Sequence, residues 1–317
     1  MTPPLRVSVL ISCFNYGRYI EETVASVLAQ ERPVDQVIVI DDGSTDDTPA
    51  YTEKAKALDP RVMVERTENR GQLAAMIRGI ELANADVVCF MDADDLYKPG
   101  HTRSFAEAFE RHPQVDYVYG DYEQFGDRTG VRRSFQAGRD HDHGRTALLA
   151  KYGLRTYGGV ASTTAARREL LLPLLEMPDA WLSDWKVAAD LAMNYFVSLA
   201  GGRKLYRFGD TVRYRVHGGN DHLAQAKLAD SNWRMRRLRA SRWVEQVSGL
   251  VCPGDALLGF IDREAKTIPR LSGVEYRNLV KTVARSPLST YTQAMMLASL
   301  TGQRLKSMLG RRAVPDG

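Results

Sequence analysis

Residues 90–99 have the sequence FMDADDLYKP, in which an apolar run meets three carboxylates. Residues 87–91 are apolar and predict a strand, and Asp92, Asp94 and Asp95 follow it directly. Because side chains alternate along an extended chain, Asp92 and Asp94 point to the same side. Like charges at that spacing repel each other unless a cation lies between them. Mg²⁺-type ions are held by one or two carboxylates together with substrate phosphates. The motif therefore predicts a metal–diphosphate site, with an acidic turn as the alternative.

The N-terminal half alternates between apolar runs and helical periodicity. This order predicts a parallel α/β sheet with right-handed crossovers, with strands at residues 7–12, 37–40, 61–65 and 85–91 and helices at about 20–28, 49–58 and 72–83. Ligands of such sheets bind beyond the carboxyl ends of the strands. Three of these ends carry polar residues, in residues 12–15 (SCFN), 41–42 (DD) and 92–94 (DAD). We expect them to converge on one crevice.

Four segments together resemble the family-2 glycosyltransferases, which have the GT-A fold. They are VSVLISCFNYGRYIEETVASVLAQ (7–30), VIVIDDGSTDDT (37–48), ENRGQLAAMIRGI (68–80) and MDADD (91–95). The resemblance is strong over residues 5–125 and traceable to about 220. It implies a nucleotide-sugar donor, UDP by default, with a divalent cation (Mn²⁺ or Mg²⁺) and inversion at the anomeric carbon.

The resemblance assigns nucleotide-sugar contacts to Ser12, Phe14, Asn15, Asp41, Asp42, Gln72, Asp92 and Ala93. It puts Ser12 and Phe14 against the base, and Asp41 accepts a hydrogen bond from the base. Asp92 serves the ribose and the metal, and Asp94 is the direct metal ligand. Packing in the core is the alternative for Phe14, and capping of the turn at Gly43 is the alternative for Asp41.

One position departs from the family pattern. Family members often have Asn two residues before the Gly that closes the third motif, and here Ile77 precedes Gly79. We expect Gln72 or Arg70 to replace that Asn in contacting the donor.

Residues 115–166 lead from the nucleotide-binding half into the acceptor half. A strand is expected at 115–120, followed by polar loop sequence to about 144 that includes His141 and His143. These histidines could line an acceptor pocket, although a mobile surface loop is the preferred interpretation. Residues 158–166 (GGVASTTAA) predict a turn and strand whose small residues suit a close approach to a sugar, or ordinary packing.

Residues 183–199 predict one helix, with Ser183 or Asp184 as its N-cap. Asp190 lies in the middle of that helix among apolar neighbours, where an isolated carboxylate is costly to bury. Burial would raise its pKa, which suits a general base near neutral pH. The resemblance also places the catalytic acidic residue of the family at Asp190, and we prefer it to Asp184.

Residues 213–220 (RYRVHGGN) resemble the closing motif of the family. Arg215 and His217 share a face if the segment is extended. By resemblance both contact the donor diphosphate, and His217 is also a candidate metal ligand, since guanidinium suits diphosphate and neutral imidazole suits metal or phosphate.

The charge is unevenly distributed along the chain. Residues 203–317 contain 21 Lys and Arg against 9 Asp and Glu, a net charge of +12, although the 317-residue chain carries only +4. Residues 233–243 (WRMRRLRASRW) are the densest basic stretch. They could face anionic lipid headgroups or nucleic acid, but a solvated helix face is the preferred interpretation. The sequence contains no nucleic-acid fold signature, so we expect no nucleic-acid partner.

Composition agrees with a globular enzyme. Apolar residues make up 44% and charged residues 26%. We find no run long enough to span a bilayer, and the N-terminus enters a strand almost at once, so no signal peptide is expected. The three scattered cysteines, Cys13, Cys89 and Cys252, suit a reducing compartment. We expect a cytoplasmic protein, with peripheral attachment to the inner face of the cell membrane as the alternative location.

We therefore expect a GT-A domain at residues 1–222 and a basic α-helical extension at 223–317. The domain divides into a nucleotide-binding half (about 5–125) and an acceptor half (about 126–222). The expected function is sugar transfer to a glycan, lipid-linked or other acceptor, in cell-surface polysaccharide or glycoconjugate synthesis. A catalytically silent nucleotide-sugar-binding protein and a nucleotidyltransferase are the alternatives. The loop after the first strand lacks the glycine-rich, Lys- or Arg-bearing pattern of nucleotidyltransferases, and G-x-G-x-x-G of dinucleotide enzymes is absent.

Overall fold

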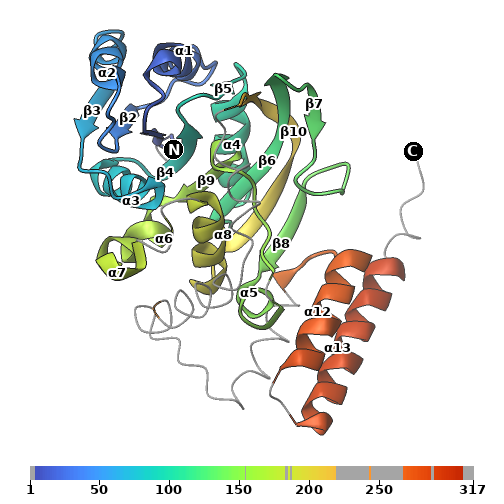
Figure 1. Cartoon of the computed structure of the whole chain (residues 1–317). Helices are drawn as coiled ribbons and strands as arrows, with labels where there is room; N and C mark the ends of the chain where they lie inside the picture. Colours follow the sequence, from blue (N-terminus) through green and yellow to red (C-terminus); the bar gives the residue numbers. More distant parts are fainter. Residues whose placement is uncertain are drawn as a thin grey trace, which may run out of the picture.

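The computed structural model describes residues 4–153, 155–182, 185, 188–218, 243, 267–286 and 289–309. A mixed sheet lies between helices, and a C-terminal pair of helices lies beside it (Figure 1). The strands are β1 (Val7–Cys13), β2 (Gln36–Asp41), β3 (Val62–Arg66), β4 (Val87–Asp92), β5 (Leu96–Tyr97), β6 (Tyr117–Gly126), β7 (Gly130–Arg132), β8 (His141–Arg145), β9 (Thr164–Arg167) and β10 (Arg203–Val216).

The longer helices cover the sheet or form the C-terminal pair. They are α1 (Gly17–Leu28), α2 (Thr48–Lys56), α3 (Gln72–Leu82), α4 (His101–Arg111), α8 (Ala189–Leu199), α12 (Gly273–Arg285) and α13 (Thr290–Leu309). Shorter turns of helix connect them: α5 (Ala147–Gly153), η1 (Ala161–Thr163), α6 (Arg168–Leu171), η2 (Leu172–Glu176) and α7 (Asp179–Leu182).

The sheet has the order β3-β2-β1-β4-β9-β6-β10-β5, with β7 on β6 and β8 on β10. The first four strands are parallel, as the βα alternation predicted. β9 then pairs antiparallel with β4 and with β6, and so joins the parallel strands to the rest of the sheet. The mostly parallel sheet flanked by helices confirms the predicted α/β architecture.

The first strands are buried on both faces, which explains their continuous apolar sequences. On β1, Leu10 packs with α3 and α8 on one face, whereas Val9 and Ile11 pack with α1 and α4 on the other. α3 lies so close to β1 that a Cβ added at Gly79 would meet Leu10 Cδ1 at 2.1 Å. Gly79 is therefore required by the packing of the helix on the sheet.

Three sequence-based expectations differ from the structure. The helix expected at 183–199 begins only at Ala189, because Ala188 has a left-handed backbone (φ 65°) that a continuous helix excludes. Asp190 is therefore in the first turn of α8 and not in mid-helix. His141 and His143 are buried in β8 and do not lie on a mobile loop. The strand expected at 115–120 begins at Tyr117 and extends to Gly126 as β6.

The C-terminal helices form a pair next to the catalytic sheet. α12 packs against α13 and against α5, which follows β8 (Figure 1). α12 begins with a capping box, in which Ser272 and Glu275 bond to each other's backbone N–H groups. In the part of the chain that the structure describes, every helix is too short or too polar to cross a bilayer. Asp184, most of the basic stretch at 233–243 and Cys252 lie outside the described residues.

Candidate active site

The carboxyl ends of β1, β2 and β4 meet at one edge of the sheet. In the parallel register, Ser12 is opposite Asp92 and Cys13 is opposite Asp41. The polar residues predicted at these strand ends are therefore brought together. Such an edge is where parallel sheets bind ligands.

Asp41 presents an unused acceptor at this edge. Its Oδ1 accepts a hydrogen bond from the Ser44 N–H (2.9 Å), which caps the turn after β2. Its Oδ2 is buried and accepts no hydrogen bond from the described residues, although Arg66 Nε is 3.5 Å away in an ion pair. A buried carboxylate oxygen without a hydrogen bond is costly, so this atom is suited to accept an N–H from a ligand.

Phe14 and Asn15 form the loop that follows β1. The Phe14 ring is 40% exposed, so packing in the core, the alternative reading of Phe14, is wrong. Asn15 has φ 58°, and its side chain accepts a hydrogen bond from the Thr45 N–H (2.8 Å). Asn tolerates this left-handed conformation better than most residues. The bond ties the loops after β1 and β2 together, and Phe14 between them is left exposed.

Asp42 organises the loop that leads into α3. Its two carboxylate oxygens accept hydrogen bonds from the backbone N–H groups of Arg70 (2.9 Å) and Gly71 (2.8 Å). The Arg70 side chain pairs with Asp179. The bonds from Asp42 fix the position from which Gln72 enters the site.

Gln72 reaches the strand ends from the first residue of α3. Its Nε2 donates to Asp92 Oδ1 at 2.7 Å and lies 3.4 Å from Ser12 Oγ. Ile77, at the position where the family often has Asn, packs against the hydrophobic core on the α3 face of the sheet. Of the two residues expected to replace that Asn, Gln72 is the one whose side chain contacts a strand-end carboxylate, since the Arg70 side chain pairs with Asp179.

Asp94 is paired with His217 at the end of β10. His217 Nε2 lies 3.0 Å from Asp94 Oδ2, and only 6% of Asp94 is exposed. Burial raises the pKa of Asp94, and the bond with His217 opposes that rise. The pair offers a carboxylate oxygen and an imidazole nitrogen at one point, which are metal-binding groups.

Asp95 and Ser162 make a support that sequence reasoning missed. Asp95 is fully buried, and its oxygens accept hydrogen bonds from Ser162 Oγ (2.5 Å) and the Arg215 N–H (2.8 Å). Burial, followed by the charges of Asp94 and Asp92, raises the pKa of Asp95 well above its usual range. Ser162 Oγ also accepts the Asp92 N–H (3.0 Å). The sequence GGVASTT (158–164) contains Ser162, but nothing in that sequence distinguishes Ser162 from the residues around it.

Arg215 joins the acidic motif after β4 to α1. Its Nε donates to the Asp94 carbonyl (2.7 Å), and its Nη2 pairs with Glu22 (2.6 Å). The guanidinium also lies over the rings of Tyr19 and Phe125. Only 16% of the side chain is exposed. Arg215 therefore holds the Asp94 backbone directly, and a diphosphate would compete with Glu22 for it.

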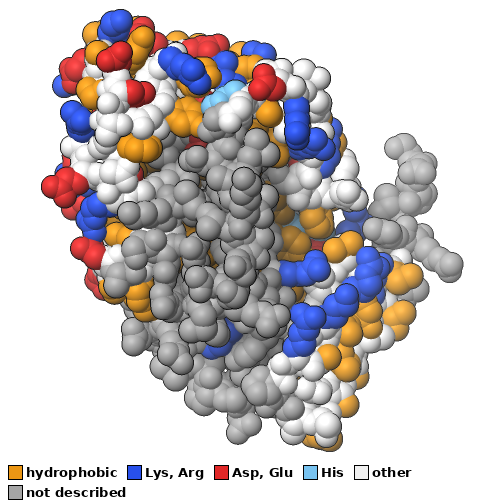
Figure 2. Space-filling view, viewed as in Figure 1, with side chains coloured by type: hydrophobic (Ala, Val, Ile, Leu, Met, Phe, Trp, Pro, Cys, Tyr) orange, Lys and Arg blue, Asp and Glu red, His pale blue; other side chains and the backbone are white. Residues whose placement is uncertain are grey.

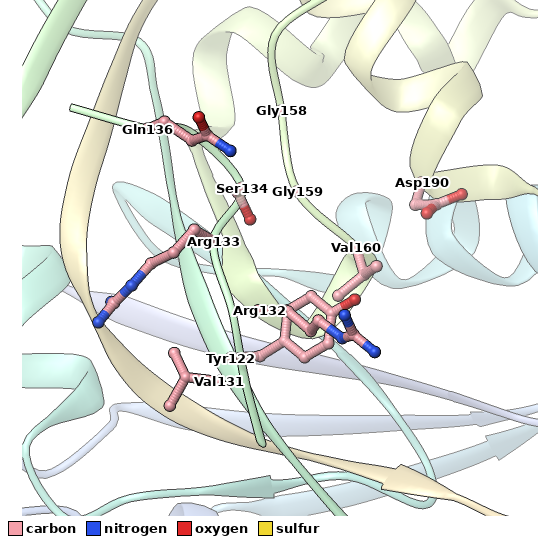
Figure 3. Close-up of a pocket in the computed structure, with 10 residues that line it drawn as sticks. All are labelled: Tyr122, Val131, Arg132, Arg133, Ser134, Gln136, Gly158, Gly159, Val160 and Asp190. Carbon is pink, nitrogen blue, oxygen red and sulfur yellow. The ribbon is translucent and has the colours of Figure 1, made fainter. Parts of the chain in front are cut away.

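Asp190 lies on a separate, open pocket of about 570 Å³ (Figure 3). The figure shows it across the pocket from residues of β6, β7 and the chain that follows β7. The pocket is lined by Tyr122, Val131, Arg132, Arg133, Ser134, Gln136, Gly158, Gly159, Val160 and Asp190. Asp190 Oδ1 accepts the Leu191 N–H (2.7 Å). Although its side chain keeps some exposure at the pocket wall, burial raises its pKa.

Comparisons with known proteins agree with this geometry. A family model described as glycosyl transferase family 2 matches residues 8–172. An uncharacterized glycosyltransferase of Nostoc sp. (strain PCC 7120) is 29% identical over 224 residues, which cover 70% of this chain and 68% of the relative. Poly-β-1,6-N-acetyl-D-glucosamine synthase of Staphylococcus aureus is 32% identical over 115 residues, 36% of this chain but only 28% of the synthase.

Solved structures share the fold. The crystal structure of S. aureus TarS 1–349 in complex with UDP-GlcNAc has a TM-score of 0.58 and 16% identity, and the match covers 97% of this chain and 92% of TarS. The complex of the same protein with UDP has a TM-score of 0.55 and 18% identity. At this identity the likeness establishes the GT-A fold.

Proposed function

Because this chain belongs to glycosyl transferase family 2, we propose that it transfers a sugar from a nucleoside-diphosphate sugar to an acceptor hydroxyl with inversion. The observation that supports this proposal most directly is the arrangement of two neighbouring sites. The edge formed by β1, β2 and β4 gathers Asp41, Asp92 and Asp94, while Asp190 lines a separate pocket. One site suits a nucleotide sugar and the other suits an acceptor. UDP is the proposed nucleotide, and the TarS complexes with UDP-GlcNAc and UDP support that choice.

The donor's nucleotide is proposed to bind at the ends of β1 and β2. The exposed Phe14 ring offers a stacking surface for the base, and Asp41 Oδ2 offers an acceptor for an N–H of the base. Uracil carries one such N–H, so UDP satisfies the buried oxygen. Ser12 and Gln72 lie next to Asp92, where the ribose would sit.

The residues present fit a divalent cation, Mn²⁺ or Mg²⁺. Asp94 Oδ2 and His217 Nε2 already face each other at 3.0 Å, and Asp92 is the last residue of β4, two positions before Asp94. These residues would hold the ion together with the diphosphate. When bound, the ion would neutralise charge on the departing nucleoside diphosphate. Arg215 and Asp95 fix the backbone and the orientation of this group.

Asp190 is proposed as the general base. Its raised pKa matches the task, because a base with a pKa nearer neutrality removes a proton more effectively. The acceptor hydroxyl loses its proton to the Asp190 carboxylate as its oxygen bonds to the anomeric carbon. The bond from that carbon to the diphosphate oxygen breaks in the same step, and its electron pair leaves with the diphosphate. A single displacement inverts the anomeric centre.

The acceptor class is proposed as a glycan or lipid-linked saccharide in cell-surface polysaccharide or glycoconjugate synthesis. The partial match to a polysaccharide synthase supports this proposal. The pocket is open, which suits the end of a longer chain.

The helices α12 and α13 are proposed to rest on an anionic membrane surface. Four apolar side chains of α13, Tyr291, Met295, Leu305 and Met308, are between 50% and 74% exposed. Residues 267–309 contain six Lys and Arg but one acid, the buried Glu275. Figure 2 shows Lys and Arg side chains in a row over this pair, beside hydrophobic ones.

A lipid surface explains this combination better than a second copy does. Two such faces would bring like charges together, whereas acidic headgroups attract basic side chains near the surface. The enzyme would then act peripherally at the inner face of the membrane, with residues 1–222 as the catalytic domain and 223–317 as the attached extension.

Donor binding and leakage test the function. A thermal-shift panel of nucleoside diphosphates and nucleotide sugars, with and without Mn²⁺, should show the largest rise in melting temperature for one nucleotide with metal, because ligands that bind the native state stabilise it. Slow metal-dependent hydrolysis of the matching nucleotide sugar should follow. Binding without any hydrolysis or transfer would instead indicate a silent sugar-nucleotide-binding protein.

A further inference from the structure

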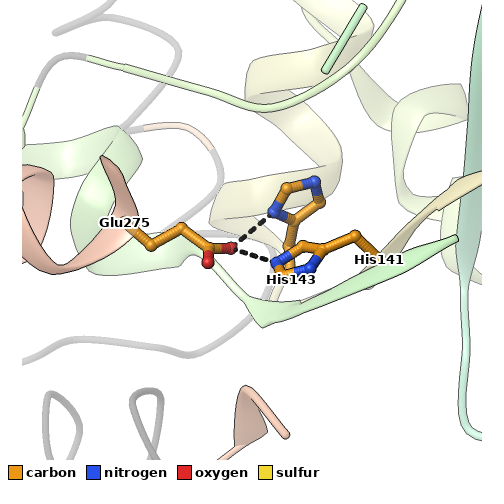
Figure 4. A group of neighbouring side chains, drawn as sticks. All are labelled: His141, His143 and Glu275. Carbon is orange, nitrogen blue, oxygen red and sulfur yellow. Dashed lines mark hydrogen bonds and ion pairs between the residues drawn. The ribbon is translucent and has the colours of Figure 1, made fainter. Parts of the chain in front are cut away.

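A second group of metal-binding side chains lies outside the candidate active site. His141 and His143 of β8 meet Glu275 of α12, more than 130 residues later in the chain (Figure 4). His141 Nε2 is 2.9 Å and His143 Nδ1 is 2.8 Å from the same oxygen, Glu275 Oε1. All three possible ligand atoms lie within 4.8 Å of one another, and the group is buried.

We propose that His141, His143 and Glu275 form a binding site for a divalent transition-metal ion of the Zn²⁺ class, which fastens the C-terminal helices to the catalytic domain. Two imidazoles and one carboxylate are ligands that Zn²⁺ takes, and imidazole distinguishes such an ion from Mg²⁺. The three residues come from the two parts of the chain that the ion would join.

The groups around these ligands hold them in place. Tyr119 Oη is 2.6 Å from His143 Nε2, the nitrogen that does not face Glu275. The other carboxylate oxygen, Glu275 Oε2, accepts the Ser272 N–H (2.9 Å) of the capping box. Metal-bound histidines almost always have such a partner on the second ring nitrogen, and it fixes the ring and its tautomer. With a metal on Nδ1, His143 would donate Nε2–H to the Tyr119 oxygen.

The geometry needs a small adjustment to admit the ion. Zn–N and Zn–O bonds of about 2.0–2.1 Å at a tetrahedral angle separate ligand atoms by roughly 3.3 Å. The two observed N···O distances of 2.9 and 2.8 Å would lengthen by about half an ångström. Rotation of the Glu275 carboxylate can supply that change.

The site lies directly behind the acceptor pocket. The Phe135 ring packs against both imidazoles, at centroid distances of 5.0 and 4.6 Å, and its sequence neighbours Ser134 and Gln136 line the pocket. Tyr157 stacks on His143 at 4.1 Å and precedes Gly158 of the pocket wall. An ion here would therefore stiffen two segments of the acceptor pocket as well as join α12 to the domain.

The test is a cobalt titration of the full chain after treatment with a chelator, in excess Mg²⁺ to occupy the oxygen-rich strand-end site. Wild type should bind one Co²⁺ with the visible absorption of a tetrahedral site, and an equimolar amount of Zn²⁺ should displace it. Added Zn²⁺ should also raise the melting temperature. Glu275→Gln keeps a residue that serves in a capping box but loses the charged ligand, and His141→Gln changes the less buried histidine.

Both variants should bind Co²⁺ at least about 10–100-fold more weakly than wild type. A loss of that size follows even when only a hydrogen-bond partner of a metal ligand is removed. His112→Gln, a histidine outside the group, should bind Co²⁺ as wild type does. A wild type that shows no saturable cobalt absorption, or variants that bind as tightly as wild type, would reduce the group to a hydrogen-bonded cluster and overturn the proposal. These measurements need no turnover, so their outcome does not depend on whether the protein is an active transferase.

Discussion

His217 Nε2 lies 3.0 Å from Asp94 Oδ2, and this contact joins the end of β10 to the end of β4 across 123 positions of sequence. Tyr16 lies just before α1 and Tyr19 lies in α1, and the centroids of their rings are 5.5 and 5.4 Å from the centroid of the His217 ring. Asp94, which follows β4, therefore has its imidazole partner only after β10 has joined the sheet. The pair is the strongest structural support for a cation at the acidic motif.

Asp94→Ala should abolish turnover and metal-dependent nucleotide binding. The cation is expected to supply several kcal/mol of charge stabilisation, so kcat should fall at least about 10³-fold. Steady-state transfer and calorimetric UDP binding, each with and without Mn²⁺, measure both effects. Glu53→Gln removes an exposed carboxylate on α2 and serves as the control. Full activity of wild type in EDTA would contradict the metal assignment.

Asp41→Asn should weaken nucleotide binding while keeping the fold. Asn retains an oxygen to accept the Ser44 N–H, but it places an amide where Oδ2 now awaits a donor. A hydrogen bond to a charged group contributes about 1.5–3 kcal/mol, so the UDP dissociation constant should rise roughly 10–100-fold. Asp47→Asn, an exposed carboxylate just before α2, is the matched control. Equal affinities for the two variants would remove Asp41 from the base-binding site.

The sequence predicted the parallel half of the sheet well because three of its strands, β1, β2 and β4, are buried on both faces. Continuous apolar runs such as residues 7–12 and 37–40 have few other uses in a globular protein. The strand ends then follow from topology, so Ser12, Asp41 and Asp92 could be placed on one edge before any coordinates were known.

The acceptor half was harder, since its elements depend on distant contacts. β8 contains two histidines, an aspartate and a glycine, a composition that favours a loop. Its histidines can be buried because Glu275 of α12, far away in sequence, lies within hydrogen-bond distance of both imidazoles. Ala188 has a left-handed backbone, which interrupts the helix predicted over 183–199. An alanine-rich sequence gives no indication of that backbone conformation. Ser162, Tyr119 and Arg132 were missed for the same reason, because each gains its role only from the tertiary structure.

Membrane attachment should depend on the charge of α12. Arg277, Lys281 and Arg285 are exposed along one side of that helix, and each basic residue near an anionic surface contributes about 1 kcal/mol. Changing all three to Gln should weaken binding to phosphatidylserine vesicles on the order of 10²-fold in co-sedimentation. The matched control changes Lys54, Lys56 and Arg103, exposed on the catalytic domain, to Gln. Equal binding to neutral and anionic vesicles at low and high salt would exclude electrostatic attachment, which salt must screen.

Asp190→Asn should separate chemistry from donor binding. The change keeps the shape of the side chain and its bond to the Leu191 N–H but removes the proton acceptor. kcat should fall roughly 10²–10⁴-fold, the usual contribution of a positioned base, with donor affinity near that of wild type. Glu176→Gln, an exposed carboxylate before α7, should leave kcat unchanged. A variant that loses mainly donor affinity would move Asp190 from the acceptor side to the donor site.

The ionisation of Asp190 should affect activity and stability in opposite ways. As the pH rises, kcat should increase, whereas the contribution of Asp190 to stability should decrease. Burial raises its pKa in the folded chain above the ordinary value of 3.8, so kcat should fall as the pH drops through that raised pKa, where the carboxylate gains a proton and cannot accept another. For stability, a raised folded pKa means that the protonated side chain is the one the fold prefers. Its contribution is present below the unfolded pKa and is lost as the pH rises through the folded pKa. Asp190→Asn, which cannot ionise, should therefore melt at a higher temperature than wild type at pH 7–8, and the difference should shrink as the pH approaches 4. Melting curves and kcat–pH profiles of both proteins check this pair of trends. A variant that is less stable than wild type at pH 8 would show that the ionised carboxylate stabilises the fold, and the assignment of Asp190 as a base held ready by burial would then fail.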